Sequence, residues 1–239
     1  MNKYDEFFKK FGGSLRTKNL VPSHPAILGV KNIARYLLGR WPYSEEVRAG
    51  NKRAYNIPEA SQLPKEYIRL CPWEAQYLFI LASRAKLGIV ETGRFHGGST
   101  FMLAWANRQV PIHTVDIAPQ NDALLKSYFD RFGVGANVDL IVGDSQHTKY
   151  PQVGSVDVLF IDADHSYEGC TADLENWYPS LIAGGHIVLH DCYYGSPVQE
   201  SVIDFMARHP ELEAVQSPYV HAEYWHLPAG SLAHLIKKQ

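Results

Sequence analysis

Side chains able to bind a nucleotide-like ligand follow a series of short apolar runs in this sequence. The first run ends at Glu91 and passes into a turn that contains glycines at positions 93, 97 and 98. Glycines between a strand and a helix let backbone N–H groups approach a ligand closely, because glycine has no side chain. The spacing differs from the G-x-G-x-x-G of dinucleotide-binding proteins, since here an acid stands shortly before the first glycine and three residues separate the first two glycines.

Each of the four later runs also ends in residues that bind ligands or carry protons. They are Asp116 and Ile117, then Asp144, Ser145 and Gln146, then Asp162, Asp164 and His165, and finally His190 and Asp191. A carboxylate such as Asp116 can accept hydrogen bonds from both hydroxyls of a ribose. Taken singly, an acid after a strand is more often a helix cap, and one histidine is more often a core residue. Five such sites in succession favour one shared ligand site.

These side chains meet only if the runs form neighbouring strands of one sheet. Strands are expected at residues 88–92, 112–117, 138–142, 156–162 and 186–190, and helices at residues 72–83, 98–108, 121–132, 167–182 and 197–208. The strand candidates are short, rich in Val and Ile and apolar on both faces, which is typical of buried parallel strands. Ligands of open parallel sheets bind at the carboxyl ends of the strands, where the polar residues would gather.

Two further features refine the expected elements. The helix expected at 167–182 has apolar or aromatic residues at helical spacing, and Ala183-Gly-Gly185 is expected to end it. After the last helix, β-rich runs at 212–217 and 222–227 are joined by a short turn. They predict a closing hairpin with one strand antiparallel to the rest, which is not expected in a classical dinucleotide-binding fold.

Residues 1–67 differ from the rest of the chain in charge. They hold 12 Lys or Arg against 6 Asp or Glu, a net charge of +6, whereas residues 68–239 hold 11 against 19, a net charge of −8. The plain interpretation is a solvated basic leader. The alternative is a helical lid or oligomerisation arm over an acidic body, because the amphipathic pieces at 4–11 and 26–38 need burial. We therefore expect one domain at 68–239 with an N-terminal helical appendage at 1–67, and a homo-oligomer.

Composition excludes several other classes. The chain is 46% hydrophobic and 20% charged, which is typical of a soluble globular protein. It has no apolar stretch long enough to span a membrane and no apolar signal core at its N-terminus. Cys71, Cys170 and Cys192 lack metal-ligand spacing, so we expect reduced thiols in a cytoplasmic protein. The basic residues are scattered without interleaved aromatic residues, so nucleic-acid binding is not expected.

The motifs resemble those of class I S-adenosylmethionine (SAM)-dependent O-methyltransferases over roughly residues 70–227. The similarity is closest to a small bacterial branch that has Phe-Ile-Asp-x-Asp-His-Ser-Tyr at strand four and Gly-Gly-x-Ile-x-x-His-Asp at strand five. That branch is related to the cation-dependent catechol and caffeoyl-coenzyme A O-methyltransferases. The resemblance implies a Rossmann-like, doubly wound α/β fold with a seven-stranded sheet and a terminal antiparallel hairpin. It also implies SAM as cofactor and a hydroxyl of a small molecule, sugar or glycan as methyl acceptor.

The resemblance further implies roles for individual residues. The cofactor-binding set is Glu91, Gly93, Phe95, Gly97, Ser99, Asp116, Ile117, Asp144, Ser145, Gln146 and Asp162. In this set Asp116 binds the ribose, and Ser145 and Gln146 flank the adenine. His165 falls where the related families keep a catalytic lysine, and Asp162 matches a magnesium ligand.

The implied metal set is Asp162, His190 and Asp191. The related enzymes have Asp-Asn or Asp-Asp where this chain has His190-Asp191. Magnesium prefers oxygen ligands, whereas Mn, Fe, Co, Ni and Zn tolerate imidazole together with carboxylate. Either a softer metal binds here, or His190 has another role and no metal is required.

Methylation of a hydroxyl requires alignment of the acceptor with the methyl group and removal of a proton. His165 is the preferred base, because an imidazole titrates near pH 6.5 and is largely neutral at pH 7. His190 is the second candidate, and Asp162 or Asp191 would orient the imidazole or hold a metal. Aromatic residues at Tyr167, Tyr193, Tyr194 and Trp225 would either wall the acceptor site or pack at the strand ends.

Three alternatives remain open to different degrees. An N-methyltransferase on a small molecule is the strongest, although the strand-four loop is not of the Asn/Asp-Pro-Pro-Tyr type. A non-catalytic cofactor-binding or scaffold protein would be expected to have eroded motifs, yet Gly93, Asp116 and Asp162 are present. An NAD-dependent oxidoreductase would need G-x-G-x-x-G and no terminal hairpin.

Overall fold

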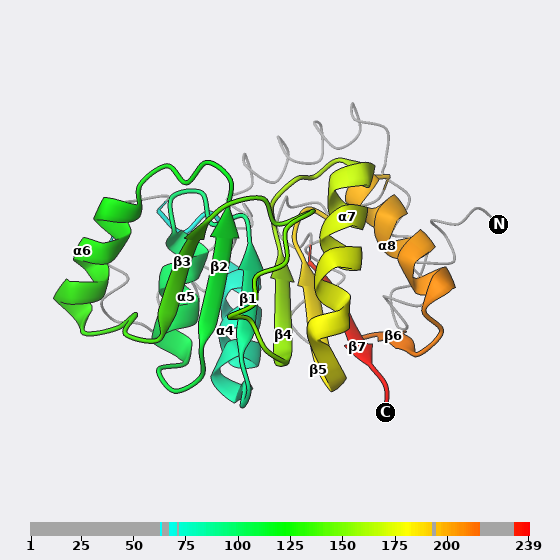
Figure 1. The fold of residues 1–239 in the computed structure, drawn as a ribbon, viewed down its shortest axis with the longest axis horizontal. Helices are drawn as coiled ribbons and strands as arrows, with labels where there is room; N and C mark the ends of the chain where they lie inside the picture. The colour runs from blue at the N-terminus through cyan, green and yellow to red at the C-terminus, as the bar shows by residue number, and fades with distance from the viewer. Residues whose placement is uncertain (1–62, 64–66, 71, 193–194, 216–231) are drawn as a thin grey trace, which may run out of the picture.

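The computed structural model describes residues 63, 67–70, 72–192, 195–215 and 232–239. Within them one mixed sheet separates two layers of helices (Figure 1). The strands are β1 (Ile89–Thr92), β2 (Ile112–Asp116), β3 (Val138–Val142), β4 (Val156–Ile161), β5 (Leu181–Leu189), β6 (Leu212–Ala214) and β7 (Ala233–Lys237). The helices are α4 (Pro72–Arg84), α5 (Gly98–Ala106), α6 (Asp122–Phe132), α7 (Tyr167–Trp177) and α8 (Pro197–Arg208), with a short 3₁₀ helix, η3 (Tyr178–Ser180).

The sheet has seven strands in the order β3-β2-β1-β4-β5-β7-β6. Strands β1 to β5 run parallel, and β7 is antiparallel to both β5 and β6. Helices α7 and α8 cover one face, and α4 and α5 cover the other (Figure 1). This arrangement confirms the predicted Rossmann-like sheet with a terminal antiparallel hairpin.

The strand that closes the sheet differs from the expected one. β7 was not predicted as a strand, yet it pairs with both β5 and β6. The expected strand at 222–227 lies outside the described residues. The predicted run at 212–217 contains β6, which is shorter than expected. Of the predicted appendage at 1–67, only Leu63 and Tyr67 are among the described residues.

The junction of α7 and β5 corrects the helix expected at 167–182. The α-helix ends at Trp177, and Pro179 lies in the 3₁₀ turn that follows it. Proline lacks the N–H that an α-helix needs and clashes with the preceding turn. Ala183-Gly-Gly185 therefore does not stop a helix but lies within β5, where a register shift against β4 marks a bulge and Gly184 has φ +82°.

Burial distinguishes the centre of the sheet from its edge. All residues of β1 are buried, and so are five of the six residues of β4. β3 lies at the edge of the sheet and pairs with β2 alone, and its residue Val142 is 64% exposed. The expectation that every parallel strand is buried on both faces is therefore wrong for β3. Cys170 and Cys192 are buried free thiols. No helix among the described residues is long and apolar enough to cross a membrane.

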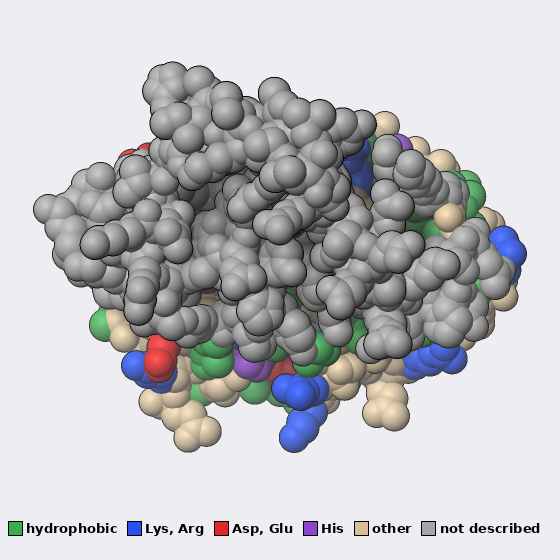
Figure 2. All heavy atoms as spheres, turned by 180° about the vertical axis from the view of Figure 1, so that it is seen from behind, with side chains coloured by type: hydrophobic (Ala, Val, Ile, Leu, Met, Phe, Trp, Pro, Cys, Tyr) green, Lys and Arg blue, Asp and Glu red, His purple; other side chains and the backbone are tan. Residues whose placement is uncertain are grey.

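The rear of the molecule offers no concentrated basic surface in its visible described part. Figure 2 shows Lys and Arg side chains at separate places around the rim of that face. The charged side chains that do gather in one place are carboxylates, and they lie at the carboxyl ends of the parallel strands.

Candidate active site

A cavity of about 720 Å³ opens at the carboxyl ends of the five parallel strands. Of the predicted cofactor-binding residues, those that line it are Gly93, Phe95, Ser99, Asp116, Ile117, Asp144, Ser145, Gln146 and Asp162. The predicted catalytic and metal residues His165, His190 and Asp191 line the same cavity. Glu91 and Gly97 are not among its lining residues. The topology thus brings five separate strand ends into one site.

The glycine turn after β1 passes through a space that no side chain could share. Gly93 has φ +81°, and a Cβ atom there would lie 2.2 Å from the carbonyl oxygen of Asp162. Helix α5 begins directly after Gly97 and has no side-chain hydrogen bond at its N-cap. The first N–H groups of a helix have no partner within it, so this end of α5 is suited to an anionic group of a ligand.

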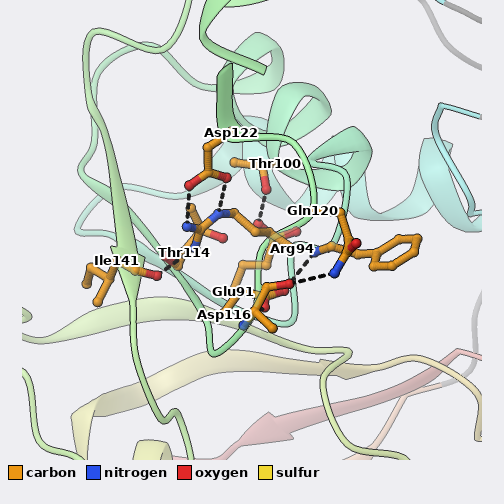
Figure 3. A network of polar contacts seen from close by, with 10 residues as sticks. Glu91, Arg94, Thr100, Thr114, Asp116, Gln120, Asp122 and Ile141 are labelled. Carbon is orange, nitrogen blue, oxygen red and sulfur yellow. Dashed lines mark hydrogen bonds and ion pairs between the residues drawn. The ribbon is translucent and has the colours of Figure 1, made fainter. Parts of the chain in front are cut away.

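Glu91 lies beneath this turn, fully buried. Its carboxylate accepts a hydrogen bond from the Thr100 hydroxyl, which joins the end of β1 to the first turn of α5 (Figure 3). Burial raises the pKa of Glu91, although hydrogen bonds to its carboxylate partly oppose that rise. In this structure Glu91 supports the turn from behind, and its predicted contact with the cofactor stays a prediction.

Arg94 is among the residues that line the cavity, but its side chain is buried within the protein. Its Nε and Nη2 atoms donate to Asp122 at 2.8 and 2.7 Å, and its Nη1 atom donates to the carbonyl oxygens of Thr114 and Ile141 at 3.0 and 2.6 Å (Figure 3). The hydrogen bond from Arg94 lowers the pKa of Asp122. One buried guanidinium therefore ties the glycine turn to α6, β2 and β3. Sequence reasoning missed it, because an arginine in a glycine-rich turn is usually exposed.

The carboxylate of Asp116 is held in place by two backbone groups. It accepts hydrogen bonds from the N–H of Phe95 at 2.8 Å and from the N–H of Ala118 at 2.7 Å, one to each oxygen. Each carboxylate oxygen has capacity for a further hydrogen bond, so both remain able to accept one from a ribose hydroxyl. Phe95 has φ +48°, and the Arg69 guanidinium lies 5.3 Å from the centre of its ring.

Two histidines and three carboxylates form a cluster at the ends of β4 and β5. Asp162 Oδ1 lies 3.2 Å from His165 Nε2 and 3.0 Å from His190 Nδ1. The other nitrogen of His165 lies 3.2 Å from Asp191, and the other nitrogen of His190 lies 3.2 Å from Glu74. Each imidazole is therefore placed between two carboxylates.

This arrangement controls the protons of the cluster. Burial alone would lower the pKa of His190, but hydrogen bonds to Asp162 and Glu74 outweigh it and raise the pKa to about 11. The hydrogen bond with Asp162 also raises the pKa of His165, against the opposing effect of burial. From the sequence His165 is expected to be an ordinary, largely neutral imidazole, but the flanking carboxylates raise its pKa and favour the protonated form instead.

The same cluster contains a set of atoms suited to a metal ion. Ligand atoms of Asp162, His165 and His190 all lie within 4.8 Å of one another, and no other such group occurs among the described residues. Asp191 of the predicted metal set is not part of this group but contacts His165. One carboxylate and two imidazoles fit Mn, Fe, Co, Ni or Zn better than Mg.

Several contributors to the site were not identified from the sequence. Tyr67, Arg69 and Leu70 line the cavity from the segment before α4, and Glu74 reaches the cluster from the first turn of α4. An acid in the first turn of a helix is common, so the sequence carried no signal of this role. Tyr167 donates to Asp204 on α8 and does not line the cavity. Tyr193, Tyr194 and Trp225 lie outside the described residues.

Comparisons with known proteins agree with this geometry. Residues 90–192 match a family model described as a methyltransferase domain. An uncharacterized protein of Acanthamoeba polyphaga mimivirus is 33% identical over 115 residues, which are 44% of this chain and 51% of that protein. The chain thus spans about half the length of this curated relative.

Two solved structures share the fold at low identity. The cofactor-bound protein Rv0187 from MTB has a TM-score of 0.57 and 22% identity, over 87% of this chain and 96% of that chain. The SAH-bound methyltransferase PaMTH1 of Podospora anserina has a TM-score of 0.57 and 16% identity, over 80% and 88%. The family match indicates a methyltransferase domain at residues 90–192, and the solved structures show that the fold is shared.

Proposed function

We propose that this chain transfers a methyl group from SAM to a hydroxyl of a small molecule, sugar or glycan. The observation that carries the proposal is the single cavity into which the glycine turn, Asp116, the Asp144–Gln146 loop and the Asp162–His165 pair all open. Across the sheet, in the order β3, β2, β1 and β4, these groups would serve the adenine, the ribose, the amino-acid end and the proton of the reaction.

The charges of the cavity suit this cofactor. Its lining includes the carboxylates of Asp116, Asp144, Asp162, Asp164 and Asp191. SAM carries a sulfonium and an ammonium group, which an acidic cavity favours, and one carboxylate, which needs a cation or free N–H groups. The N-terminal end of α5 and the guanidinium of Arg69 offer both to that carboxylate.

Transfer to oxygen would proceed in line: the acceptor oxygen bonds to the methyl carbon, the carbon–sulfur bond breaks, and SAH leaves. The Asp162–His165 pair is the best placed group to take the hydroxyl proton, because it lines the cavity and His165 is 45% exposed. A divalent transition metal held by Asp162, His165 and His190 would lower the pKa of the acceptor hydroxyl. With or without such a metal ion, the side chains of Asp162, His165 and His190 would hold and orient the acceptor.

The first test is binding. Calorimetry should show that the chain binds SAH and SAM, and that NAD binds negligibly. Replacing Asp116 by Ala removes two hydrogen bonds from ribose hydroxyls to a charged acceptor, each worth about 1.5–3 kcal/mol, and should weaken SAH binding at least about tenfold. Asp130→Ala, which removes an exposed carboxylate of α6, is the matched control. Absence of SAH binding by the unaltered chain would refute the proposal.

The second test is transfer. The chain is incubated with methyl-labelled SAM and a panel of hydroxylated acceptors beside amine acceptors of matched size, and formation of SAH and of labelled product is measured. Labelled product from hydroxylated acceptors alone is the expected result. Product from amines alone would establish the N-methyltransferase alternative, and SAH binding without product from either class would favour a non-catalytic protein.

A further inference from the structure

Glu74 brings a carboxylate to the cluster from outside the strand ends. It lies in the first turn of α4, ahead of β1 in the sequence, and is only 4% exposed. Its Oε2 atom is 3.2 Å from His190 Nε2. His190 lines the cavity and Glu74 does not, so Glu74 contacts this histidine from the side facing the protein interior.

A role at the helix end does not explain this burial. An acid in the first turn stabilises a helix through its dipole, but it does so equally well when exposed to water. A carboxylate removed from water costs free energy unless a charged or hydrogen-bonding partner compensates for it. His190 is such a partner, and it stands between Glu74 on one ring nitrogen and Asp162 on the other.

We propose that Glu74 is a positioning residue that fixes the ring of His190 and, through Asp162, the orientation of His165. A flip of the His190 ring would turn both of its nitrogens away from their carboxylates. Asp162 would then lose one of the two imidazoles that share its Oδ1 atom and could turn away from His165. The inference rests on the proposed function in that Asp162 and His165 are its proton-handling pair.

The same assignment would hold if Asp162 and His190 served as ligands of a metal ion. Histidines that ligate metals almost always donate their second ring N–H to a carboxylate or carbonyl, which fixes their orientation. Glu74 occupies that second position on His190. Its influence therefore reaches His165 through two residues, His190 and Asp162, although Glu74 does not line the cavity.

The test compares Glu74→Gln with the unaltered chain by NMR of the histidine ring nitrogens, in metal-free protein with and without SAH. Gln keeps the shape of the side chain and removes its charge. We expect the His190 signals to change and, as the decisive observation, the His165 signals to change as well. Glu175→Gln, which alters an exposed glutamate of α7 paired with Arg208, should leave both sets of signals unaltered. His165→Ala and His190→Gln assign the signals.

Three results would overturn the inference. The first is a Glu74→Gln protein whose His165 signals are identical to those of the unaltered chain. The second is the same change of signals in Glu175→Gln. The third is a loss of SAH affinity greater than about tenfold in a folded Glu74→Gln protein, which would assign Glu74 to the cofactor pocket. If Glu74→Gln does not fold, Glu74→Asp keeps the charge but shortens the side chain, and the same His165 comparison decides. With an acceptor in hand, kcat should fall about 10- to 100-fold at unchanged KM for SAM. Failure of the unaltered chain to bind SAH would count against the proposed function alone, because the metal-free NMR comparison needs no cofactor.

Discussion

At the scale of single residues, carboxylates decide what the histidines of the site can do. An imidazole between two carboxylates holds its proton more tightly than a free one, so it becomes a base only at higher pH. The identity of Asp162, His165, His190 and Asp191 could be predicted from the sequence, because each follows an apolar strand. Their pairing could not, because Glu74 joins them from a helix far away in the sequence.

The pH dependence of turnover should report this environment. Because contact with Asp162 raises the pKa of His165, its neutral form is gained only as pH rises above the usual imidazole value of about 6.5. We expect kcat/KM to increase with pH through a midpoint above that value, and Asp162→Asn to move the midpoint downward.

His165→Ala should lower kcat by about 10²–10⁴-fold with SAH affinity retained. Near-unaltered turnover in His165→Ala, with His209→Gln as the control, would contradict the base assignment.

Arg69 leads to a second prediction about a residue that the sequence did not single out. If its guanidinium binds the carboxylate of the cofactor, Arg69→Ala should weaken SAH binding about tenfold or more and leave the affinity for methylthioadenosine unchanged, since that ligand lacks the amino-acid portion. Arg108→Ala is the matched control, because Arg108 also stacks on an aromatic ring, Trp105, but does not line the cavity. Equal losses for both ligands would show that Arg69 acts elsewhere, and intact SAH binding with a raised KM for the acceptor would indicate an anionic acceptor.

At the scale of elements, local signals were reliable where sequence and packing agree. The strand at 138–142 and the helix at 197–208 have the predicted bounds, because a short Val- and Ile-rich run and a helix begun by Ser196 and Pro197 are decided locally. The end of α7 is set by Pro179, a local signal that the apolar spacing outweighed in the prediction. The strand β7 is decided by pairing with β5 and β6, which a single stretch of sequence does not reveal. The apolar spacing that suggested a longer helix was real, since Tyr178 and Leu181 are buried in the core although neither is in α7.

The buried Arg94–Asp122 pair is the element-level contact most open to test. Arg94→Met removes the cation. Asp122, whose side chain is 25% exposed, and two backbone carbonyls then lose the group that donates to them. Breaking such a pair from one side costs about 3–5 kcal/mol, and the partial exposure of Asp122 places the expected loss near the lower end. Urea unfolding should detect it. Arg208→Met, which breaks an exposed pair with Glu175, should cost less than about 1 kcal/mol, and an equal loss in both variants would contradict the structural role of Arg94.

At the scale of the whole molecule, the topology of the sheet gathers negative charge at one of its ends. The carboxyl ends of five parallel strands bring the cavity carboxylates together, which accounts for part of the negative charge of residues 68–239. The basic segment at residues 1–67 is of opposite sign, and we retain the prediction that it covers the active site or a subunit interface.

Limited proteolysis tests that prediction directly. If residues 1–67 are packed against the acidic site, cleavage within them should be slow and should slow further when SAH is added. The same digestion in high salt should be faster, since screening weakens attraction between exposed charges. Rapid cleavage throughout this segment with full activity in the trimmed protein would support the basic-leader interpretation.

The stability of the whole fold should depend on one acid that the proposed reaction does not use. Asp173 on α7 is fully buried, and burial raises its pKa to about 6, although a hydrogen bond from Thr92 favours the charged form. A raised pKa means that the folded state binds this proton more tightly than the unfolded state does. The resulting stabilisation is complete below about pH 4 and is lost as pH rises through 6. Asp173→Asn removes this titration. The stability of the variant minus that of the unaltered chain, both as free energies of unfolding, should therefore be about 2 kcal/mol higher at pH 7.5 than at pH 4.5. Urea unfolding at both values measures this difference, and Asp130→Asn, at an exposed position on α6, should show none. A difference of opposite sign would mean that Asp173 is held as a carboxylate in the folded protein.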